Sequence, residues 1–274
     1  MRTCFFRWDA AESPFPSAAP ALVASAILTC LALGRGKVEA LLCGDTGNGK
    51  GSRELYARLA SELPGRKDTQ GLTFHYLMPD VDGHNRVFMA CQECEHRPVL
   101  VADAGFMYAA KMSGYAADYD LFTPDAGELA FLADEKAPHP FYARGFLLDS
   151  HDNVPGLLTR AFEHQNAARF MIIKGARDAI SEGGRIMYWV DEPQTPAMEA
   201  IGGTGDMVTG IVTGLLAGGM ELPQAALTAA RAARYAGSPA APTPATQIAE
   251  ILPFVPQALR KVLDQDDREE SGQK

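Results

Sequence analysis

The chain has 274 residues, 47% of them hydrophobic, which is enough apolar material for the core of one large α/β domain. Its 25 basic and 34 acidic residues give a net charge of −9 without a long basic run, which argues against nucleic-acid and anionic-membrane partners. The five cysteines are scattered and no signal-peptide pattern is present, so we expect reduced thiols and a cytoplasmic protein.

The first predicted element is an apolar helix over residues 18–33. It follows the acidic residues Asp9 and Glu12 rather than the basic segment of a signal peptide, and it is short for a membrane span. We therefore expect a buried helix that packs against the sheet that follows.

A glycine-rich loop over residues 44–52 separates a predicted buried strand, residues 38–43, from an amphipathic helix that ends near Leu63. The loop matches the first seven positions of a P-loop, but Gly51 stands where that motif has the serine or threonine that binds magnesium. A ligand-binding loop and a solvent-exposed loop are equally compatible with this stretch.

Two more strands are predicted at residues 72–78 and 98–102, and Asp103 follows the second of them. An acidic residue at the carboxyl end of a buried strand in an α/β sheet lies where ligands bind, so Asp103 is a candidate site residue. A helix is predicted to follow over residues 106–114.

Cys91 and Cys94 have the spacing of a metal-binding pair and lie close to His96 in the sequence. No second pair of ligands follows at the distance that a zinc finger needs. We therefore predict two reduced thiols and no metal site.

A short strand at residues 120–123 leads into a helix that begins at Pro124 and contains Glu128. Asp125 lies in the first turn, where an acidic side chain interacts favourably with the free N–H groups of a helix. A proline-started, acid-capped helix without chemistry explains this stretch as well as a binding site does.

A loop over residues 139–153 and a helix over residues 157–168 precede a buried strand, residues 169–174, which ends in Lys174. A lysine at this place can neutralise the phosphates of a nucleotide, although a lysine that only reaches solvent would give the same pattern. Residues 179–190 are predicted to form a hairpin, because two glycines mark a turn between two apolar runs.

The glycine-rich segment 202–205 leads into a predicted buried helix. Free N–H groups at a helix start and the small size of glycine suit a phosphate, and Asp206 is placed to remove a proton from an attacking hydroxyl. The alternative is a glycine turn in which Asp206 caps the helix. Gly210, Gly214 and Gly218 recur every four residues within the helix, which predicts that another element packs closely against them.

The remaining predicted helices cover residues 222–236 and 246–263, the second interrupted at Pro253 and Pro256. The charged tail, residues 264–274, is predicted to be disordered.

The alternation of strands and helices predicts a three-layer α/β/α domain over residues 1–263 with a mostly parallel sheet. In such a sheet, strand ends and helix starts share one edge. We therefore expect the candidate groups to converge there, namely Asp103, Thr123, Lys174 and residues 203–206.

Four motifs, in this order along the chain, resemble the ribokinase-like superfamily and, within it, the ATP- or ADP-dependent NAD(P)H-hydrate dehydratases. The motifs are Pro98-Val-Leu-Val-Ala-Asp-Ala104, Phe122-Thr-Pro-Asp-Ala-Gly-Glu128, Ile173-Lys-Gly175 and Gly202-Gly-Thr-Gly-Asp206 with Gly210. The resemblance extends over roughly residues 38–263 and implies a ribokinase-like fold.

The resemblance also implies roles for individual residues, of which Asp206 matches the catalytic base. The implied nucleotide-binding residues are Lys174, Gly175, Asp178, Gly203, Thr204 and Gly205. The implied substrate-binding residues are Gly51, Ser52, Gly83, Asp103, Asp125 and Glu128. Asp125 stands where the family has a substrate-contacting histidine, and the match around Gly51, Ser52 and Gly83 is loose, so the nucleotide half is better supported than the acceptor half.

The implied activity is the repair of hydrated NADH or NADPH by a hydro-lyase. ATP or ADP, with Mg²⁺, phosphorylates the substrate hydroxyl, and loss of phosphate restores the nicotinamide ring. A kinase of the same superfamily, acting on a sugar or a heterocyclic alcohol, is the alternative. A non-catalytic nucleotide-binding protein would not need Asp206. The interval from Thr123 to Glu128 favours the dehydratase, and we also expect a homo-oligomer.

Overall fold

The computed structural model describes residues 18–45, 48–136 and 153–272. The chain divides into two compact units, one made of residues Glu39–Asp191 and the other of Met1–Val38 with Glu192–Lys274. We describe each unit separately. The predicted single domain over residues 1–263 stays a prediction, and the predicted loop at 139–153 lies almost wholly outside the described residues.

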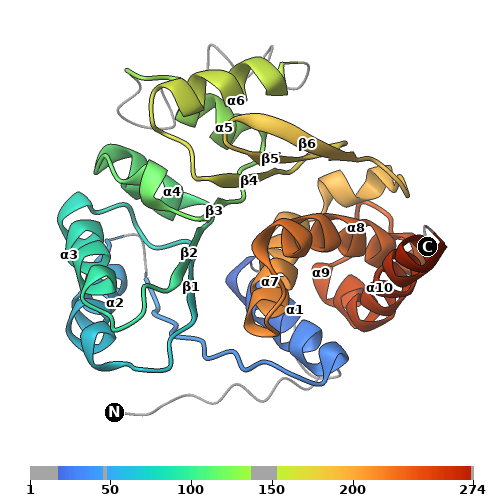
Figure 1. Cartoon of the computed structure of the whole chain (residues 1–274), viewed down its shortest axis with the longest axis horizontal. Helices are drawn as coiled ribbons and strands as arrows, with labels where there is room; N and C mark the ends of the chain where they lie inside the picture. The colour runs from blue at the N-terminus through green and yellow to red at the C-terminus, as the bar shows by residue number, and fades with distance from the viewer. Residues whose placement is uncertain (1–17, 46–47, 137–152, 273–274) are drawn as a thin grey trace. The chain divides into compact units, whose positions relative to one another are not determined.

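The first unit contains a six-stranded sheet whose strands follow one another in chain order (Figure 1). The strands are β1 (Gly71–Phe74), β2 (Val99–Ala102), β3 (Leu121–Phe122), β4 (Phe170–Ile173), β5 (Asp178–Glu182) and β6 (Arg185–Val190). Strands β1 to β4 are parallel, whereas β5 is antiparallel to both β4 and β6. The predicted mostly parallel sheet and the predicted hairpin are confirmed.

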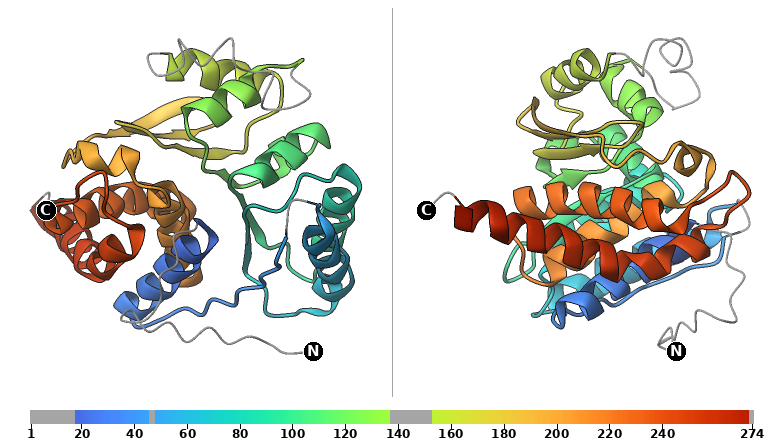
Figure 2. Two further views of the ribbon diagram at one scale, coloured as in Figure 1. Left: turned by 180° about the vertical axis from the view of Figure 1, so that it is seen from behind. Right: turned by 90° about the vertical axis from the view of Figure 1, so that its right-hand side faces the viewer.

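The helices of this unit lie on one face of the sheet in both views (Figures 1 and 2). They are α2 (Lys50–Glu62), η1 (Leu63–Gly65), α3 (Val81–Gln92), α4 (Gly105–Met112), η2 (Ala116–Asp118), α5 (Ala126–Ala133) and α6 (Val154–Glu163). Alternate strand residues such as Leu100, Phe122 and Met171 pack against this layer of helices. Phe106 of α4 stacks on Phe74 of β1 with ring centroids 4.2 Å apart. The helices therefore hold the strand ends of β1 to β4 on a continuous apolar core.

Two predicted strands of this unit differ from the structure, and one helix was missed. Residues 38–43 are not a strand, and Leu42 is 51% exposed, because this segment joins no strand of the described sheet. Strand β1 ends at Phe74 rather than at residue 78. Helix α3 was not predicted, although the side chain of Asp80 accepts from the N–H of Gly83 and caps it.

The second unit is helical among its described residues. Its elements are α1 (Ala18–Leu33), η4 (Pro196–Ala200), α7 (Thr204–Ala217), α8 (Leu222–Ala240), α9 (Ile248–Ile251), η5 (Leu252–Phe254) and α10 (Val255–Gly272). The predicted interruption at Pro253 is confirmed, since η5 separates α9 from α10, and Pro256 lies in the first turn of α10, where proline is tolerated. None of the described helices, α1 included, combines the length and the apolar character that crossing a bilayer requires.

The predicted disorder of the charged tail is wrong for residues 264–272, which continue α10. Arg231 of α8 pairs with Asp266, and it donates a 3.1 Å hydrogen bond to Gln265. Leu259 and Val262 are buried on the same helix. Helix α10 therefore buries apolar side chains and forms polar contacts with α8. The high charge of the segment, on which the prediction of disorder rested, does not reveal these contacts.

Helix α1 packs along α7 within the helical unit, and the glycines of α7 explain how closely the two helices approach each other. A β-carbon on Gly210 would collide with the carbonyl oxygen of Leu22. One on Gly214 would lie 2.7 Å from the carbonyl oxygen of Ala26. The prediction that these glycines meet a closely packed element is confirmed.

Gly210→Ala is expected to lower the free energy of unfolding by about 1–3 kcal/mol, because the added methyl group overpacks the α1–α7 contact. This loss opposes the gain of roughly 1 kcal/mol that alanine brings to a helix interior. Urea denaturation measures the difference. Gly65→Ala is the control, since nothing lies within 4 Å of a β-carbon there. Equal stability of the two variants would contradict the close packing.

Candidate functional site

A buried ion pair joins the carboxyl ends of β2 and β4. Asp103 directly follows β2, Lys174 directly follows β4, and the Nζ of Lys174 donates to the Oδ1 of Asp103 at 2.9 Å. The two side chains are 2% and 14% exposed. Opposite charges at this depth compensate each other's loss of hydration. Asp103, predicted to bind substrate, and Lys174, predicted to bind nucleotide, thus form an ion pair with each other.

His75 is a third member of this cluster, and the sequence analysis missed it. It follows β1, and its Nδ1 lies 3.6 Å from the Oδ2 of Asp103, with the imidazole only 6% exposed. The predicted strand ran to residue 78, so His75 fell inside it, whereas the true strand ends at Phe74 and leaves His75 at the edge where ligands bind. A strand end placed four residues earlier would have revealed it.

The backbone around the cluster is strained at two strand ends. Tyr76, next to His75, has φ 45°, and Ala104, next to Asp103, has φ 50°. Residues with a β-carbon pay roughly 1–3 kcal/mol for such conformations, which persist only where the surrounding structure imposes them. The N–H of Ala104 donates to the Oδ1 of Asp103 at 2.9 Å, so the unusual backbone orients the carboxylate.

Asp125 and Glu128 form a capping box at the start of α5. The Oδ1 of Asp125 accepts from the N–H of Glu128 at 2.7 Å, and the Oε2 of Glu128 accepts from the N–H of Asp125 at 2.9 Å. Tyr108 of α4 donates to Glu128 as well. Burial raises the pKa of Glu128 above its usual range, although Lys174 acts in the opposite direction. Asp125 is therefore a helix cap, and its role toward substrate stays a prediction.

The turn after β4 is shaped by Asp178. Its buried carboxylate accepts from the N–H of Gly175 at 3.0 Å and closes the segment that follows Lys174. Arg177 in the same turn pairs with Asp191 at 3.2 Å. Asp178 thus stabilises the turn after β4, and its predicted contact with a nucleotide stays a prediction.

The glycine-rich loop before α2 is organised by Asp45. Its carboxylate accepts from the N–H of Gly49 at 2.9 Å and from both the N–H and the hydroxyl of Ser52 at 3.2 and 3.1 Å. A β-carbon on Gly51 would collide with the carbonyl oxygen of Gly44. Close backbone packing therefore explains why a glycine stands at position 51. The hydrogen bonds to Asp45 explain why a serine stands at position 52.

Gly83 is explained in the same way, because a β-carbon there would lie 2.8 Å from the ring of Tyr56. A hollow of about 330 Å³ nevertheless opens beside this loop, lined by Asn48, Gly49, Ser52, Arg53, Met78, Pro79 and Asp80. The predicted substrate contacts of Gly51, Ser52 and Gly83 stay predictions.

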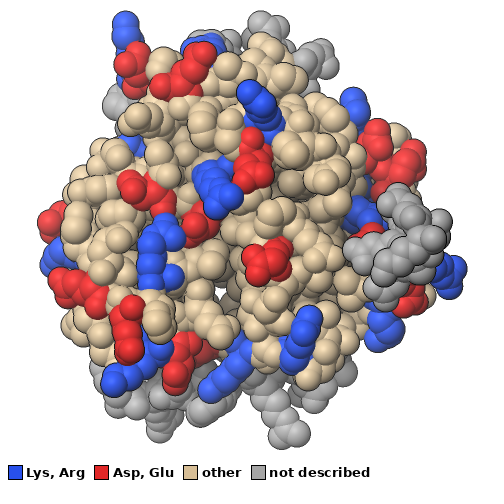
Figure 3. All heavy atoms as spheres, in the orientation of Figure 1, with Lys and Arg blue, Asp and Glu red and all other residues tan. Residues whose placement is uncertain are grey.

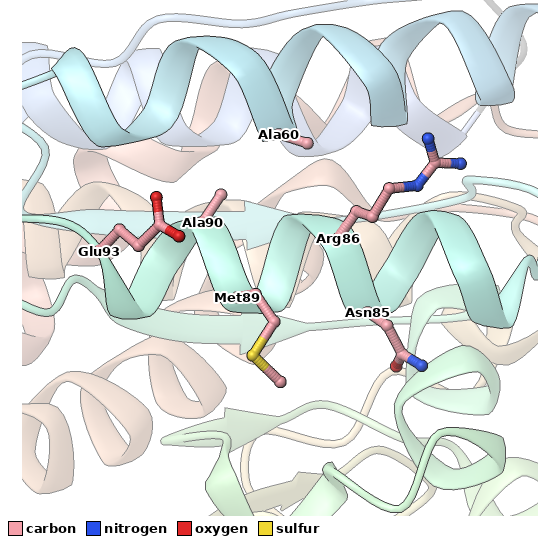
Figure 4. Close-up of a pocket in the computed structure, with 6 residues that line it drawn as sticks. All are labelled: Ala60, Asn85, Arg86, Met89, Ala90 and Glu93. Carbon is pink, nitrogen blue, oxygen red and sulfur yellow. The ribbon is translucent and has the colours of Figure 1, made fainter.

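Figure 4 shows another hollow of about 340 Å³, lined by Ala60, Asn85, Arg86, Met89, Ala90 and Glu93. Its lining comes only from α2, α3 and Glu93, the residue that follows α3, and Arg86 and Glu93 extend at its opposite ends. Arg86 already pairs with Asp82 one turn away at 2.7 Å. We therefore assign the candidate site to the strand ends and not to this hollow.

The start of α7 in the helical unit forms the second group of predicted site residues. Gly203, the residue before the helix, has φ 98° and offers no side chain to cap it. Thr204 directs its hydroxyl away from the first turn, donating to the carbonyl oxygens of Met198 and Ile201. The helix start therefore offers its N–H groups to an anion, and Asp206, 9% exposed, lies in the first turn beside them.

Cys91 and Cys94 are packed thiols. Burial raises the pKa of Cys91 to about 12. The Sγ of Cys94 donates to the carbonyl oxygens of Leu63 and Ala90, each at 3.5 Å. Both groups are therefore protonated at neutral pH and contribute to the packing of α3.

On the face drawn in Figure 3, basic and acidic side chains of the described residues are interspersed. A nucleic acid binds through a continuous basic track, which this face does not offer among those residues. The charge pattern of this face thus agrees with small-molecule chemistry at the strand ends.

The sequence model of a family described as NAD(P)H-hydrate dehydratase matches residues 82–253. An uncharacterised protein of Methanocaldococcus jannaschii is 38% identical over 227 residues, which cover 82% of this chain and 93% of that protein. The ADP-dependent (S)-NAD(P)H-hydrate dehydratase of Cenarchaeum symbiosum is 26% identical over 209 residues, which cover 74% of this chain and 67% of that protein.

Solved structures resemble the fold at low sequence identity. A ribokinase-like superfamily protein of Enterococcus faecalis superposes with a TM-score of 0.58 and 16% identity over 89% of this chain and 84% of that chain. The ADP/ATP-dependent NAD(P)H-hydrate dehydratase of Bacillus subtilis, co-crystallised with ATP and Mg²⁺, superposes with a TM-score of 0.57 and 16% identity. The match covers 90% of this chain and 85% of that chain. The predicted ribokinase-like α/β fold is confirmed.

Proposed function

Because the chain belongs to the NAD(P)H-hydrate dehydratase family, we propose that it restores hydrated NADH and NADPH in a reaction driven by ATP or ADP. The observation that carries this proposal is the start of α7, where Gly203 provides no side-chain cap and the carboxylate of Asp206 lies in the same first turn. An anion-binding helix start suits the phosphates of a nucleotide. A base next to it suits the hydroxyl that attacks them.

In the proposed reaction, the N–H groups that follow Gly203 hold the phosphoryl group that is transferred. Asp206 accepts the proton of the substrate hydroxyl as that oxygen attacks phosphorus. Loss of the new phosphate ester from the ring then restores the dihydronicotinamide. Thr204 supports the helix start, since its hydroxyl is bonded to carbonyl oxygens of the preceding turn.

The nucleotide is proposed to carry Mg²⁺ on its phosphates, because the Bacillus subtilis dehydratase was co-crystallised with ATP and Mg²⁺. We assign no protein ligand to the ion.

Lys174 contributes positive charge near the strand ends, and its ion pair with Asp103 partly offsets that charge. A homo-oligomer in the cytoplasm is part of the same proposal, and light scattering of the purified protein measures its oligomeric state.

The test is incubation with hydrated NADH or NADPH and either ATP or ADP, while the absorbance of the reduced nicotinamide is followed. Recovery of that absorbance, together with release of inorganic phosphate, is expected with one of the two nucleotides. Nucleotide consumption that leaves a stable phosphorylated product would instead support a kinase. Recovery of absorbance without any nucleotide would contradict the role of the α7 start.

Asp125→Asn is expected to lower the Michaelis constant for hydrated NADPH by about fivefold, because a unit charge near a phosphate contributes on the order of 1 kcal/mol in water. Stability should not change, since asparagine caps a helix as well as aspartate does. Asp125→His would restore the residue that the family has, but it removes the cap. Loss of activity in Asp125→Asn would indicate an acceptor that Asp125 recognises directly, and would favour the kinase.

A further inference from the structure

The proposed reaction contains two proton transfers, and Asp206 accounts for only the first. Phosphorylation removes the proton of the hydroxyl. The later loss of phosphate restores a carbon–carbon double bond only if the carbon next to the one that carries the phosphate gives up a proton. This elimination needs a proton acceptor of its own, because the ester oxygen leaves as phosphate. The inference that follows rests on the proposed function.

We propose that His75 is the proton acceptor of this elimination and that Asp103 and Lys174 hold it in position. Its Nδ1 lies 3.6 Å from the Oδ2 of Asp103, and the Oδ1 of the same carboxylate accepts from Lys174 at 2.9 Å. The three residues follow β1, β2 and β4, so they share the sheet edge where ligands bind in parallel α/β folds.

The carboxylate determines which nitrogen of His75 acts as the base. The negative charge of Asp103, 3.6 Å from Nδ1, favours the tautomer that carries the ring proton on that nitrogen and the lone pair on Nε2. Lys174 and the N–H of Ala104 both bind the other oxygen of Asp103 and keep the carboxylate oriented. The oriented carboxylate thus acts on the imidazole through its charge, at a separation longer than a hydrogen bond.

The surroundings also restrict the imidazole. The side chain is 6% exposed, and the ring of Tyr76 packs edge-on at a centroid distance of 4.2 Å. Tyr76 itself has φ 45°. Strain of this kind clusters at sites that require a defined side-chain direction.

The chemical step balances without any further reagent. The Nε2 of His75 takes the proton from the ring carbon adjacent to the phosphorylated carbon. The electron pair of that C–H bond forms the new double bond, and the C–O bond breaks so that inorganic phosphate leaves with its electron pair. Nothing is oxidised or reduced, and the proton on His75 then passes to water.

The test is a single-turnover experiment with His75→Gln in excess over hydrated NADPH and the active nucleotide. Nucleotide cleavage is expected at the wild-type rate, while recovery of the dihydronicotinamide absorbance slows by at least about 10²-fold, as for loss of a general base. A phosphorylated intermediate should accumulate in between. His96→Gln is the matched control, since His96 is exposed, and it should behave as wild type in both steps.

A second variant separates chemistry from damage to the fold. His75→Ala should regain absorbance recovery when imidazole is added, with no change in nucleotide cleavage. Equal loss of both steps without rescue would show that His75 is only structural, and unchanged recovery in His75→Gln would show that it takes no proton; either result overturns the inference. If the wild-type protein restores no absorbance with any nucleotide, the proposed function fails and this inference falls with it.

Discussion

Asp206→Asn is expected to slow restoration of hydrated NADPH by at least about 10²-fold, because an amide cannot accept the proton of the attacking hydroxyl. Nucleotide affinity should stay close to that of the wild-type protein. The N–H groups that start α7 belong to the backbone, and the substitution leaves them in place. Calorimetric titration with the nucleotide and the absorbance assay measure the two quantities separately.

Asp82→Asn is the control for this substitution, since Asp82 lies in α3 and pairs with Arg86 on the surface. It should change neither quantity. A loss of rate in Asp206→Asn of less than about 10²-fold would argue against general-base catalysis by Asp206. A loss of nucleotide affinity as large as the loss of rate would instead assign Asp206 to binding.

Lys174→Met is expected to lower the free energy of unfolding by about 3–5 kcal/mol, because it leaves the carboxylate of Asp103 buried without its ion-pair partner. Lys174→Met/Asp103→Asn should regain most of that loss, since it leaves no uncompensated charge. Denaturation in urea measures both variants. An equal loss in the single and the double variant would show that the pair does not determine the stability of this edge.

Arg169→Met is the matched control for the buried pair. Arg169 binds Glu182 at 2.9 Å, but both side chains are exposed, so its loss should cost less than about 1 kcal/mol. The comparison therefore separates the effect of burial from the effect of removing a positive charge. It also tests whether Lys174 serves the fold as much as it serves a ligand.

Much of the fold could be predicted from local sequence patterns. The helix over Ala18–Leu33, the hairpin of β5 and β6, and the glycine-entered helix α7 all follow from periodicity and turn residues within a few positions. The four-residue repeat of glycines also predicted close packing. It did not identify α1 as the partner, because the spacing of small residues says nothing about which element approaches them.

Strand boundaries were the weakest part of the sequence reading. An apolar run does not show whether a neighbouring strand is there to pair with it, which is why residues 38–43 were misassigned. The same uncertainty placed His75 within a strand. Burial and hydrogen-bond partners decide such ends, and both depend on residues distant in the chain.

The motifs around Asp103, Lys174 and Asp206 are visible in the sequence, because glycines, strand ends and helix starts impose local requirements on residue type. Only the tertiary structure pairs Asp103 with Lys174, which lies 71 positions away, and brings His75 to the same carboxylate. It alone shows that Asp125 is committed to capping α5. The physical reason is that residue type and spacing act through the local backbone, whereas charge compensation and side-chain orientation arise when the strands align in the sheet.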